Sequence, residues 1–251
     1  RRRKIQACLN FTTPVLQEPA VRKAIAMAID KDKFTSVLLN GNGTPAVGPF
    51  PANMPCGGDA VHTDAYNAEQ AKKLLQEAGW TDTDGNGYVD KNGQDLTIRW
   101  LTYTSRQELP LLAEAAQAFL KEVGIRAEIN ATDNYNDFLK RGDWDIYAKA
   151  FVAAPTGDPQ YYFTTHVLES SSYNSGQYHN ERVEELTRQL RGEFDPAARS
   201  RLAVQISQQL LDDNAFIYAS HLKMSFVMKS NIKGFTAHPS DYYEITSELE
   251  V

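Results

Sequence analysis

The order of elements along the chain predicts an α/β protein, with a mixed β-sheet and helices that flank it. Alternating apolar and polar residues predict strands at 5–11, 96–103 and 125–130, because the side chains of a strand point alternately to its two faces. A helix predicted to begin at Pro110 separates the last two strands, and Gly124 ends it. Repetition of strand, helix and strand is typical of a sheet with crossover helices.

Capping residues predict the remaining helices. Pro19 begins a helix whose apolar residues recur at helical spacing, and Asp30 can cap a second, short helix. Asn67 is predicted to cap a helix over 68–78, and Asn180 and Asp195 begin two more. Apolar stretches at 215–220 and 222–228 predict two closing strands.

Length and composition limit the function classes. The chain has 251 residues, of which 42% are hydrophobic, and no linker or repeat divides it, so we expect one domain. Its net charge of −6 provides no basic field for binding nucleic acid, and the basic run at 1–4 is predicted to be a solvated edge. No apolar stretch approaches the roughly 20 residues of a membrane helix.

Two cysteines, Cys8 and Cys56, are too few for a disulfide framework or for a zinc site of the cysteine type. Their spacing leaves open whether they pair with each other.

Residues 143–166 are the strongest candidate for a functional site. The alternation of apolar and polar residues predicts a strand that breaks at 155–157, after which Asp158-Pro159 is predicted to be an N-cap and first helical residue. Proteins of the α/β class tend to place ligands at the carboxyl ends of strands. The aromatic rings around this turn suit an apolar pocket with a few polar groups, although such rings are also typical of a core. The predicted ligand contacts are Phe151, Pro155, Thr156, Asp158, Tyr161, Tyr162 and His166.

His166 is the preferred polar group and metal ligand of this segment, about two helical turns beyond Pro159. The chain has five histidines, and no two are spaced to form a two-histidine metal site on one helix. A satisfied surface or core histidine is the alternative for His166.

Two loops also carry a prediction. Residues 40–55 contain too many glycines and prolines for a helix or strand, and form either a functional loop or a surface crossover. Residues 82–90 place Asp82, Asp84, Asn86 and Asp90 at a spacing similar to that of a calcium loop. Gly93 stands where such a loop needs a bidentate Glu, so we expect poor calcium affinity, and a hairpin built from ordinary turn residues is the alternative.

Catalytic motifs are missing from the sequence. It contains no nucleophile elbow, dinucleotide fingerprint or phosphate loop, and no carboxylate pair stands in an apolar setting that would tune one as an acid. We therefore expect a binding protein and no enzyme, with a hydrolase of peptides or sugars as the less favoured class.

Four segments resemble, in order, segments of the family 5 solute-binding proteins, which are the dipeptide, oligopeptide and nickel receptors of ABC importers. They are residues 10–14 with 21–30, residues 68–80 with 82–87, residues 154–159 and residues 180–186. The resemblance implies a type II periplasmic-binding-protein-like lobe. Residues 1–251 would form the C-terminal lobe of a two-lobed receptor, with the N-terminal lobe preceding Arg1.

The resemblance also implies a location and partners. Such a receptor closes its two lobes around a small ligand at the periplasmic or extracellular face of the membrane, where a lipid can anchor it. It then meets the permease subunits of an ABC transporter. We expect a monomer with no cofactor and no nucleic-acid partner.

The residues before Asp158 bear on the ligand. Peptide receptors of the family place an aspartate there to hold the amino terminus of the peptide, whereas this chain has Ala153, Ala154 and Pro155, so Asp158 would have to take that role. The Ala-Pro pair looks like the nickel branch. The resemblance therefore implies nickel or a metal chelate as the ligand, with an oligopeptide or dipeptide as the alternative.

Two positions depart from the nickel branch. Phe151 or Val152 replaces its tryptophan, and its metal-contacting histidine corresponds to a position near Ser171. Either His166 substitutes for that histidine, or the metal arrives already wrapped in a small chelator.

Overall fold

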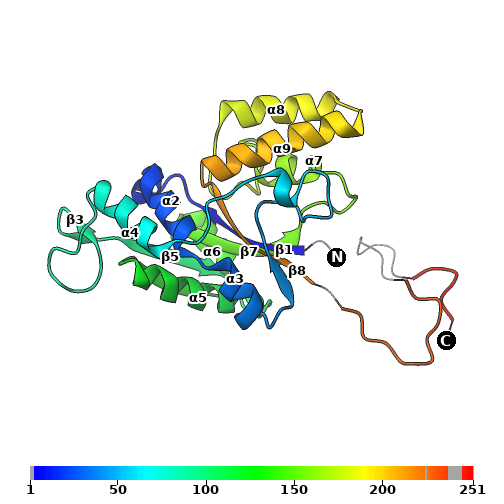
Figure 1. The fold of residues 1–251 in the computed structure, drawn as a ribbon, viewed down its shortest axis with the longest axis horizontal. Helices are drawn as coiled ribbons and strands as arrows, with labels where there is room; N and C mark the ends of the chain where they lie inside the picture. The colour runs from blue at the N-terminus through cyan, green and yellow to red at the C-terminus, as the bar shows by residue number, and fades with distance from the viewer. Residues whose placement is uncertain (1–2, 224, 237–244, 251) are drawn as a thin grey trace.

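A six-stranded mixed sheet organises the chain in this computed structural model, which describes residues 3–223, 225–236 and 245–250. The strand order is β2-β8-β1-β7-β5-β6 (Figure 1). β1 pairs antiparallel with β7 and β8, whereas β5 pairs parallel with β6 and β7. The strands are β1 (Arg3–Leu9), β2 (Gly43–Pro45), β5 (Thr97–Thr102), β6 (Arg126–Ala131), β7 (Ile146–Val152) and β8 (Phe216–Leu222), and a separate hairpin is formed by β3 (Asp90–Lys91) and β4 (Gln94–Asp95).

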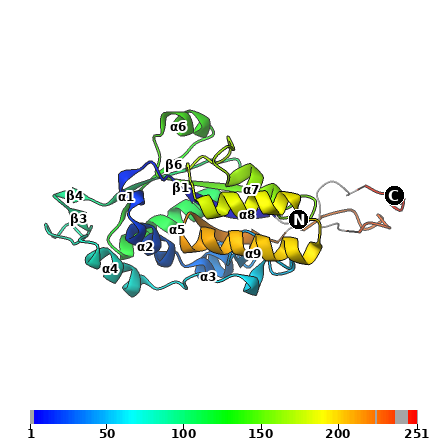
Figure 2. The same cartoon turned by 90° about the horizontal axis from the view of Figure 1, so that it is seen from above.

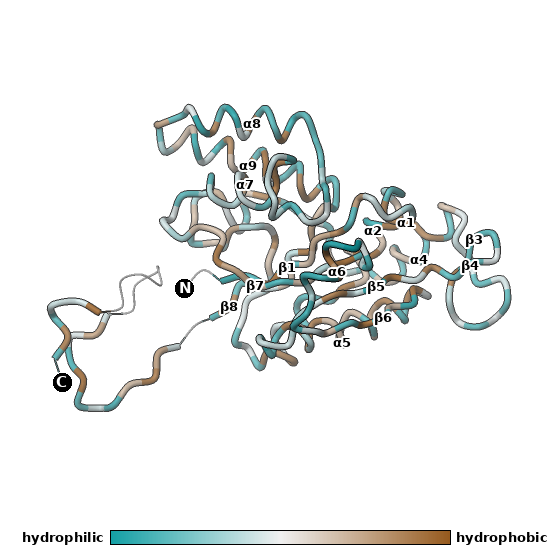
Figure 3. Tube along the Cα trace, turned by 180° about the vertical axis from the view of Figure 1, so that it is seen from behind, coloured by the Kyte–Doolittle hydropathy of each residue, from teal (hydrophilic) through white to brown (hydrophobic). Residues whose placement is uncertain are grey.

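Helices cover both faces of the sheet. The helices are α1 (Pro14–Gln17), α2 (Pro19–Ala28), α3 (Lys31–Lys33), α4 (Ala68–Glu77), α5 (Glu108–Glu122), α6 (Tyr135–Arg141), α7 (Gln160–His166), α8 (Glu181–Gly192) and α9 (Pro196–Asp212), with a π-helix η1 (Phe34–Leu38) and a 3-10 turn η2 (Gly58–Ala60). Apolar residues of α2, α4 and α5 pack on one face, and those of α7, α8 and α9 on the other. Figure 2 shows α8 and α9 lying side by side. Hydrophilic residues predominate along α8 in Figure 3, as expected for an outer helix.

Side chains of β1 therefore enter two separate cores. Ile5, Ala7 and Leu9 join the core under α2, α4 and α5, while Cys8 joins the core under α7, α8 and α9. Lys4 and Gln6 point to the same face as Cys8 by the period of the strand, and both are fully buried. The prediction of a solvated edge at 1–4 is thus wrong for Lys4, because helices cover the face that the sequence pattern assigned to solvent.

Local capping chemistry explains the helix starts. The side chains of Asn67, Asn180 and Asp195 accept backbone hydrogen bonds from the first turns of α4, α8 and α9, as predicted. Asp30 does the same for α3, by accepting from the Lys33 amide.

Several boundaries differ from the prediction. α5 begins at Glu108 and not at Pro110, which stands in the first turn. Of the two predicted closing strands, only β8 forms, and the described residues 225–228 contain no strand. The loop at 40–55 contains the short strand β2, which pairs with the end of β8. Cys8 and Cys56 are both buried as thiols and are not joined by a disulfide.

At one end of the sheet, β1 begins beside the ends of β7 and β8. Lys4, near the start of β1, pairs with Phe151 near the end of β7 and with His221 near the end of β8. The chain thus enters and leaves the sheet at neighbouring points, and after β8 it runs away from the sheet (Figure 1). Among the helices that the structure describes, none combines the length and apolar content needed to cross a membrane.

We predict that Asp145→Ala lowers the free energy of unfolding by about 3 kcal/mol, because the hydrogen bonds and the ion pair of a buried carboxylate are lost. The buried Asp145 carboxylate accepts hydrogen bonds from the Arg99 amide at 2.7 Å, from its guanidinium and from the Thr13 hydroxyl. Urea unfolding measures the change.

Asp143→Ala is the matched control. Asp143 pairs with Arg141 at 2.9 Å in an exposed position, so its loss should cost less than about 1 kcal/mol. Equal losses for the two variants would contradict this account of Asp145.

Candidate functional site

Four rings form a surface where β7 ends and α7 runs back over it. The centroids of Phe151 and His166 lie 4.1 Å apart, and those of Tyr161 and Tyr173 lie 6.4 and 5.7 Å from His166. Tyr161 and Tyr173 are 43% and 61% exposed, whereas His166 is nearly buried. We call Phe151, Tyr161, His166 and Tyr173 the ring set.

Tyr162 lies beneath the ring set and is fully buried. Its ring stacks with Phe151 at 6.0 Å, and its hydroxyl donates to the Gln6 side chain at 3.0 Å. Tyr162 therefore supports the ring set from below and does not line its surface. The core interpretation therefore holds for Tyr162, whereas ligand contact by the ring set stays a prediction.

Two lysines stand behind the ring set. The ammonium of Lys149 lies 3.5 Å from His166 Nδ1 and donates to the Tyr173 carbonyl at 3.3 Å. The ammonium of Lys4 lies over the rings of Tyr162, Phe151 and Tyr218, at 3.4, 5.0 and 4.8 Å from their centroids. Lys4 is fully buried, and Lys149 is 9% exposed.

Burial and mutual repulsion shift the titration of these groups. Burial lowers the pKa of both lysines, and the charge of Lys149 lowers the pKa of Lys4 further. Burial, then Lys149, then Lys4 lower the pKa of His166 to about 2. The His166 ring is therefore neutral at physiological pH.

Asp158 is committed to another partner. Its carboxylate forms an ion pair with Arg199, with Nη2 at 2.7 Å from Oδ2 and Nε at 3.1 Å from the same oxygen. It also accepts from the Gln160 amide at 2.8 Å, so it caps α7 although Pro159 occupies the N-cap position. Of the two roles that the sequence allowed for Asp158, holding the turn is the one observed here. Contact with a ligand stays a prediction.

Pro155 and Thr156 lie in the turn before Asp158, where Thr156 is exposed and Pro155 half-buried. A cavity of about 270 Å³ adjoins this turn, and none of the ring set lines it. Its walls come from Met54, Pro55, Cys56, Gly157, Asp158, Pro159, Pro196, Arg199 and Ser200.

Sequence reasoning missed Lys4, Lys149, Tyr173 and Arg199. Lys149 and Lys4 occupy polar positions of strands, which sequence patterns assign to a solvated face. Arg199 lies 41 residues from Asp158, so nothing local pairs the two. The signal for Lys4 and Lys149 would have been that the chain supplies enough amphipathic helices to cover both faces of its sheet.

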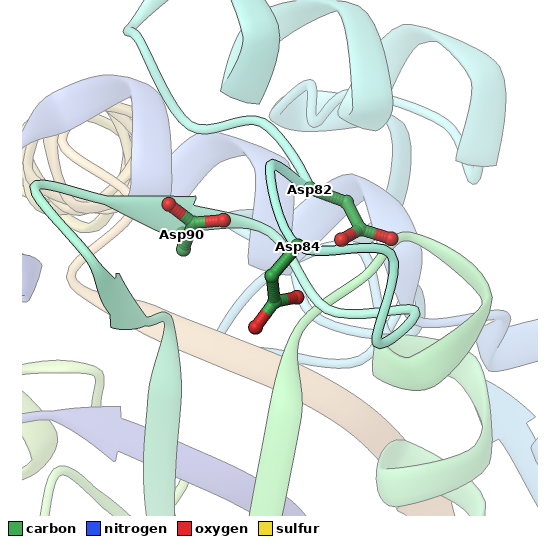
Figure 4. A group of neighbouring side chains, drawn as sticks. All are labelled: Asp82, Asp84 and Asp90. Atoms are coloured by element: carbon green, nitrogen blue, oxygen red, sulfur yellow. The ribbon is translucent and has the colours of Figure 1, made fainter.

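The acidic loop before β3 brings three carboxylates together. Oxygens of Asp82, Asp84 and Asp90 lie within 4.8 Å of one another (Figure 4). Each already accepts hydrogen bonds: Asp82 from the amides of residues 85 and 87, Asp84 from Asn86, and Asp90 from Thr83. These are ordinary turn contacts. Calcium binding by Asp82, Asp84, Asn86 and Asp90 remains a prediction.

The chain is similar to known proteins in sequence and in fold. Residues 5–174 match the family described as bacterial extracellular solute-binding proteins, family 5 Middle. The nickel-binding protein NikA of Staphylococcus aureus is 28% identical over 227 residues, which cover 90% of this chain and 44% of NikA. The oligopeptide-binding protein AppA of Bacillus subtilis is 26% identical over 243 residues, which cover 94% of this chain and 45% of AppA.

A solved structure of one of these relatives has a similar fold. The crystal structure of the Staphylococcus aureus NikA with Ni(L-His)2 superposes on 94% of this chain and 49% of that chain, with a TM-score of 0.77 and 25% identity. The chain therefore spans less than half the length of the two curated relatives, 44% and 45%. The expected mixed sheet with flanking helices is confirmed.

We predict that the chain loses stability as the pH falls from about 6.5 to 5. The folded pKa of His166 is lowered to about 2 and that of His221 to about 4, against about 6.5 for an unfolded histidine. Below pH 6.5 the unfolded chain therefore binds more protons, and the free energy of unfolding falls by up to about 1.4 kcal/mol per pH unit for each ring.

Urea unfolding between pH 7.5 and 5 measures this slope. His166→Gln should remove the contribution of one ring and leave that of the other. An identical slope in the wild type and the variant would contradict the assignment of a neutral, buried His166.

We also predict that the acidic loop binds calcium only weakly, with a dissociation constant on the order of 1 mM, because no bidentate Glu completes it. A calcium titration followed by melting temperature tests this, with Asp84→Asn as the variant and magnesium as the control ion. Calcium binding with a micromolar dissociation constant that is lost in the Asp84→Asn variant would contradict the turn interpretation.

Proposed function

Because the chain belongs to family 5 of the bacterial extracellular solute-binding proteins, we propose that it is one lobe of an ABC importer's receptor that captures nickel in a small chelate. The ring set is the observation that carries this proposal. It presents two exposed tyrosines, a half-buried phenylalanine and a neutral histidine at one strand end. An aromatic surface with few polar groups suits a small ligand that a second lobe closes over.

Chelated nickel fits this surface better than the bare ion. The Nδ1 of His166 faces the ammonium of Lys149 at 3.5 Å, so a cation bound directly to this ring would be repelled by a nearby positive charge. A chelate spreads the metal's charge over its own ligands and needs aromatic and hydrogen-bonding contacts instead. NikA of Staphylococcus aureus, to which the chain is similar, was crystallised with such a complex.

A short peptide is the second candidate, and the similarity to AppA favours it. The amino terminus of a peptide needs an anionic partner, and Asp158 was the candidate in the sequence. Its ion pair with Arg199 counts against that role, since the carboxylate is already neutralised. Chelated nickel is therefore the first choice.

The remaining parts of the proposal rest on the family. It comprises extracellular solute-binding proteins, so we propose binding without turnover, at the outer face of the cell membrane. The partners are the permease subunits of the importer, which would recognise the closed form. Attachment through a lipid and a monomeric state remain predictions.

We predict that the nickel–histidine complex raises the melting temperature of the chain, and that Tyr161→Ala weakens this complex about tenfold through loss of an exposed ring contact. Ligand at 100 times its dissociation constant stabilises by about 2.7 kcal/mol, so weak binding is measurable at high concentration. Thermal shift with the complex, free nickel, nickel with excess chelator, and two short peptides makes the comparison.

Tyr66→Ala is the matched control, because Tyr66 is 42% exposed, like Tyr161 at 43%, and contacts Phe119 away from the ring set. A shift with peptides alone would replace chelated nickel by peptide as the ligand. The absence of any shift would contradict both candidates.

A further inference from the structure

We propose that Arg199 is a positioning residue for the ligand surface, because its guanidinium holds the turn from which α7 begins. The inference rests on the proposed function and deepens it, since it names a residue outside the ring set on which ligand affinity depends. Two features of the structure support it: the contacts of this one guanidinium and the cavity behind the turn.

The Arg199 guanidinium connects the start of α7 to the end of α8. On one side, its Nη2 lies 2.7 Å from Asp158 Oδ2 and 3.1 Å from Gln160 Oε1, so it holds the turn and the first residue of α7 together. On the other side, its Nη1 donates to the Leu190 carbonyl at 2.8 Å and to the Glu193 carbonyl. We call these bonds the clamp. A planar guanidinium fixes the directions of all of them at once.

Packing supports the turn only in part. The cavity of about 270 Å³ adjoins it, and Gly157, Asp158 and Pro159 form part of the cavity wall. The Gly157 amide donates to the Ala154 carbonyl at 3.1 Å, which is a bond within the turn itself. Groups that border a cavity have no dispersion contacts on that side, so packing restricts their position less. The clamp therefore has a large share in fixing the turn.

The ring set depends on the turn through α7. Asp158 accepts the Gln160 amide at 2.8 Å, and Tyr161 is the next residue, so the clamp sets the first turn of this helix. Tyr162 and Phe163 are fully buried and fix the side of α7 that faces the core. Tyr161 is 43% exposed and lies on the other side. Its position follows from the helix start that the clamp holds.

The exposure of the ion pair indicates more than a stabilising role. The side chain of Asp158 is 41% exposed and that of Arg199 is 17% exposed. Ion pairs that solvent reaches contribute little to the free energy of unfolding. They can still select one local geometry, and a binding surface gains affinity when its geometry is fixed before the ligand arrives. We therefore expect Arg199 to affect ligand affinity more than stability.

Hydrogen exchange tests the turn without any ligand. The amides of Gly157, Gln160 and Tyr162 donate within the turn or the start of α7, and NMR of the chain labelled with ¹⁵N measures their exchange. In Arg199→Met we expect these amides to exchange about tenfold faster, because the turn opens locally more often. The amides of β7 should keep their rates. Arg126→Met should leave all of these rates unchanged.

Arg126→Met is the matched control. Arg126 and Asp95 form an ion pair with the same N–O distance of 2.7 Å as Arg199 and Asp158, and their side chains are 37% and 25% exposed. Arg126 lies on β6, away from the ring set. Each variant thus removes one arginine from one ion pair, so the loss of charge is equal. Unfolding curves establish that both variants are folded.

The affinity for the nickel–histidine complex tests the consequence for the ligand. Arg199→Met should weaken this complex about tenfold, because the ring surface is no longer held in one geometry. Arg126→Met should leave the dissociation constant unchanged. Arg199→Lys keeps the charge but not the planar fork, so it should recover part of the loss. It also provides the same comparison if Arg199→Met does not fold.

A double-mutant cycle separates positioning from general destabilisation. Asp158→Asn keeps an oxygen for the Gln160 amide and removes the charge that Arg199 meets. If the two residues act through their shared pair, the variant with both changes should exchange no faster and bind no more weakly than Arg199→Met alone. Additive effects of the two changes would overturn the inference.

Failure of this inference differs from failure of the proposed function. Unchanged exchange of the three amides in Arg199→Met would overturn the inference, as would equal effects of Arg199→Met and Arg126→Met on affinity. If the proposed function fails, the nickel–histidine complex does not bind even the wild-type chain. The exchange rates would still respond to Arg199→Met in that case, and they alone would then decide whether Arg199 positions the turn.

Discussion

The coverage of the sheet on both faces is the constraint on which the rest of this structure depends. Once α7, α8 and α9 lie over the face that carries Lys4, Gln6 and Lys149, polar residues of β1 and β7 have no route to solvent except at the sheet edge. Aromatic rings fill the space around them, and the hydroxyl of Tyr162 forms hydrogen bonds with the side chains of Gln6 and Tyr218. The ring set forms the outer side of this layer of buried polar and aromatic side chains.

Local chemistry made much of the fold predictable. The side chains of Asn67, Asn180 and Asp195 each accept from a backbone amide two or three residues further on. The helix starts that they mark could therefore be read without knowledge of the tertiary structure. The strand β7 followed from the alternation of residues 144–150. By contrast, 222–228 is apolar enough for a second strand, yet β8 ends at Leu222 and no partner among the described residues extends it.

The site was only partly predictable, because its electrostatics come from distant segments. The sequence singled out Phe151, Tyr161 and His166, which the fold brings together. It gave no indication that Lys149 would face His166, or that Lys4, from the first strand, would lie under Phe151. Asp158 could be placed at the turn from its neighbour Pro159, but its neutralisation by Arg199 depends on the fold bringing α9 beside the turn that precedes α7. Charge pairing across such separations is a property of the tertiary fold.

These features give one account of ligand choice, in which the exposed rings of the ring set provide the contact surface. The account is tested most directly by a structure of the chain with the nickel–histidine complex bound. It predicts that the rings of Tyr161 and Phe151 lie against the chelate and that the nickel ion keeps its own histidine ligands. Nickel bound directly to His166, or a complex bound away from the ring set, would contradict it.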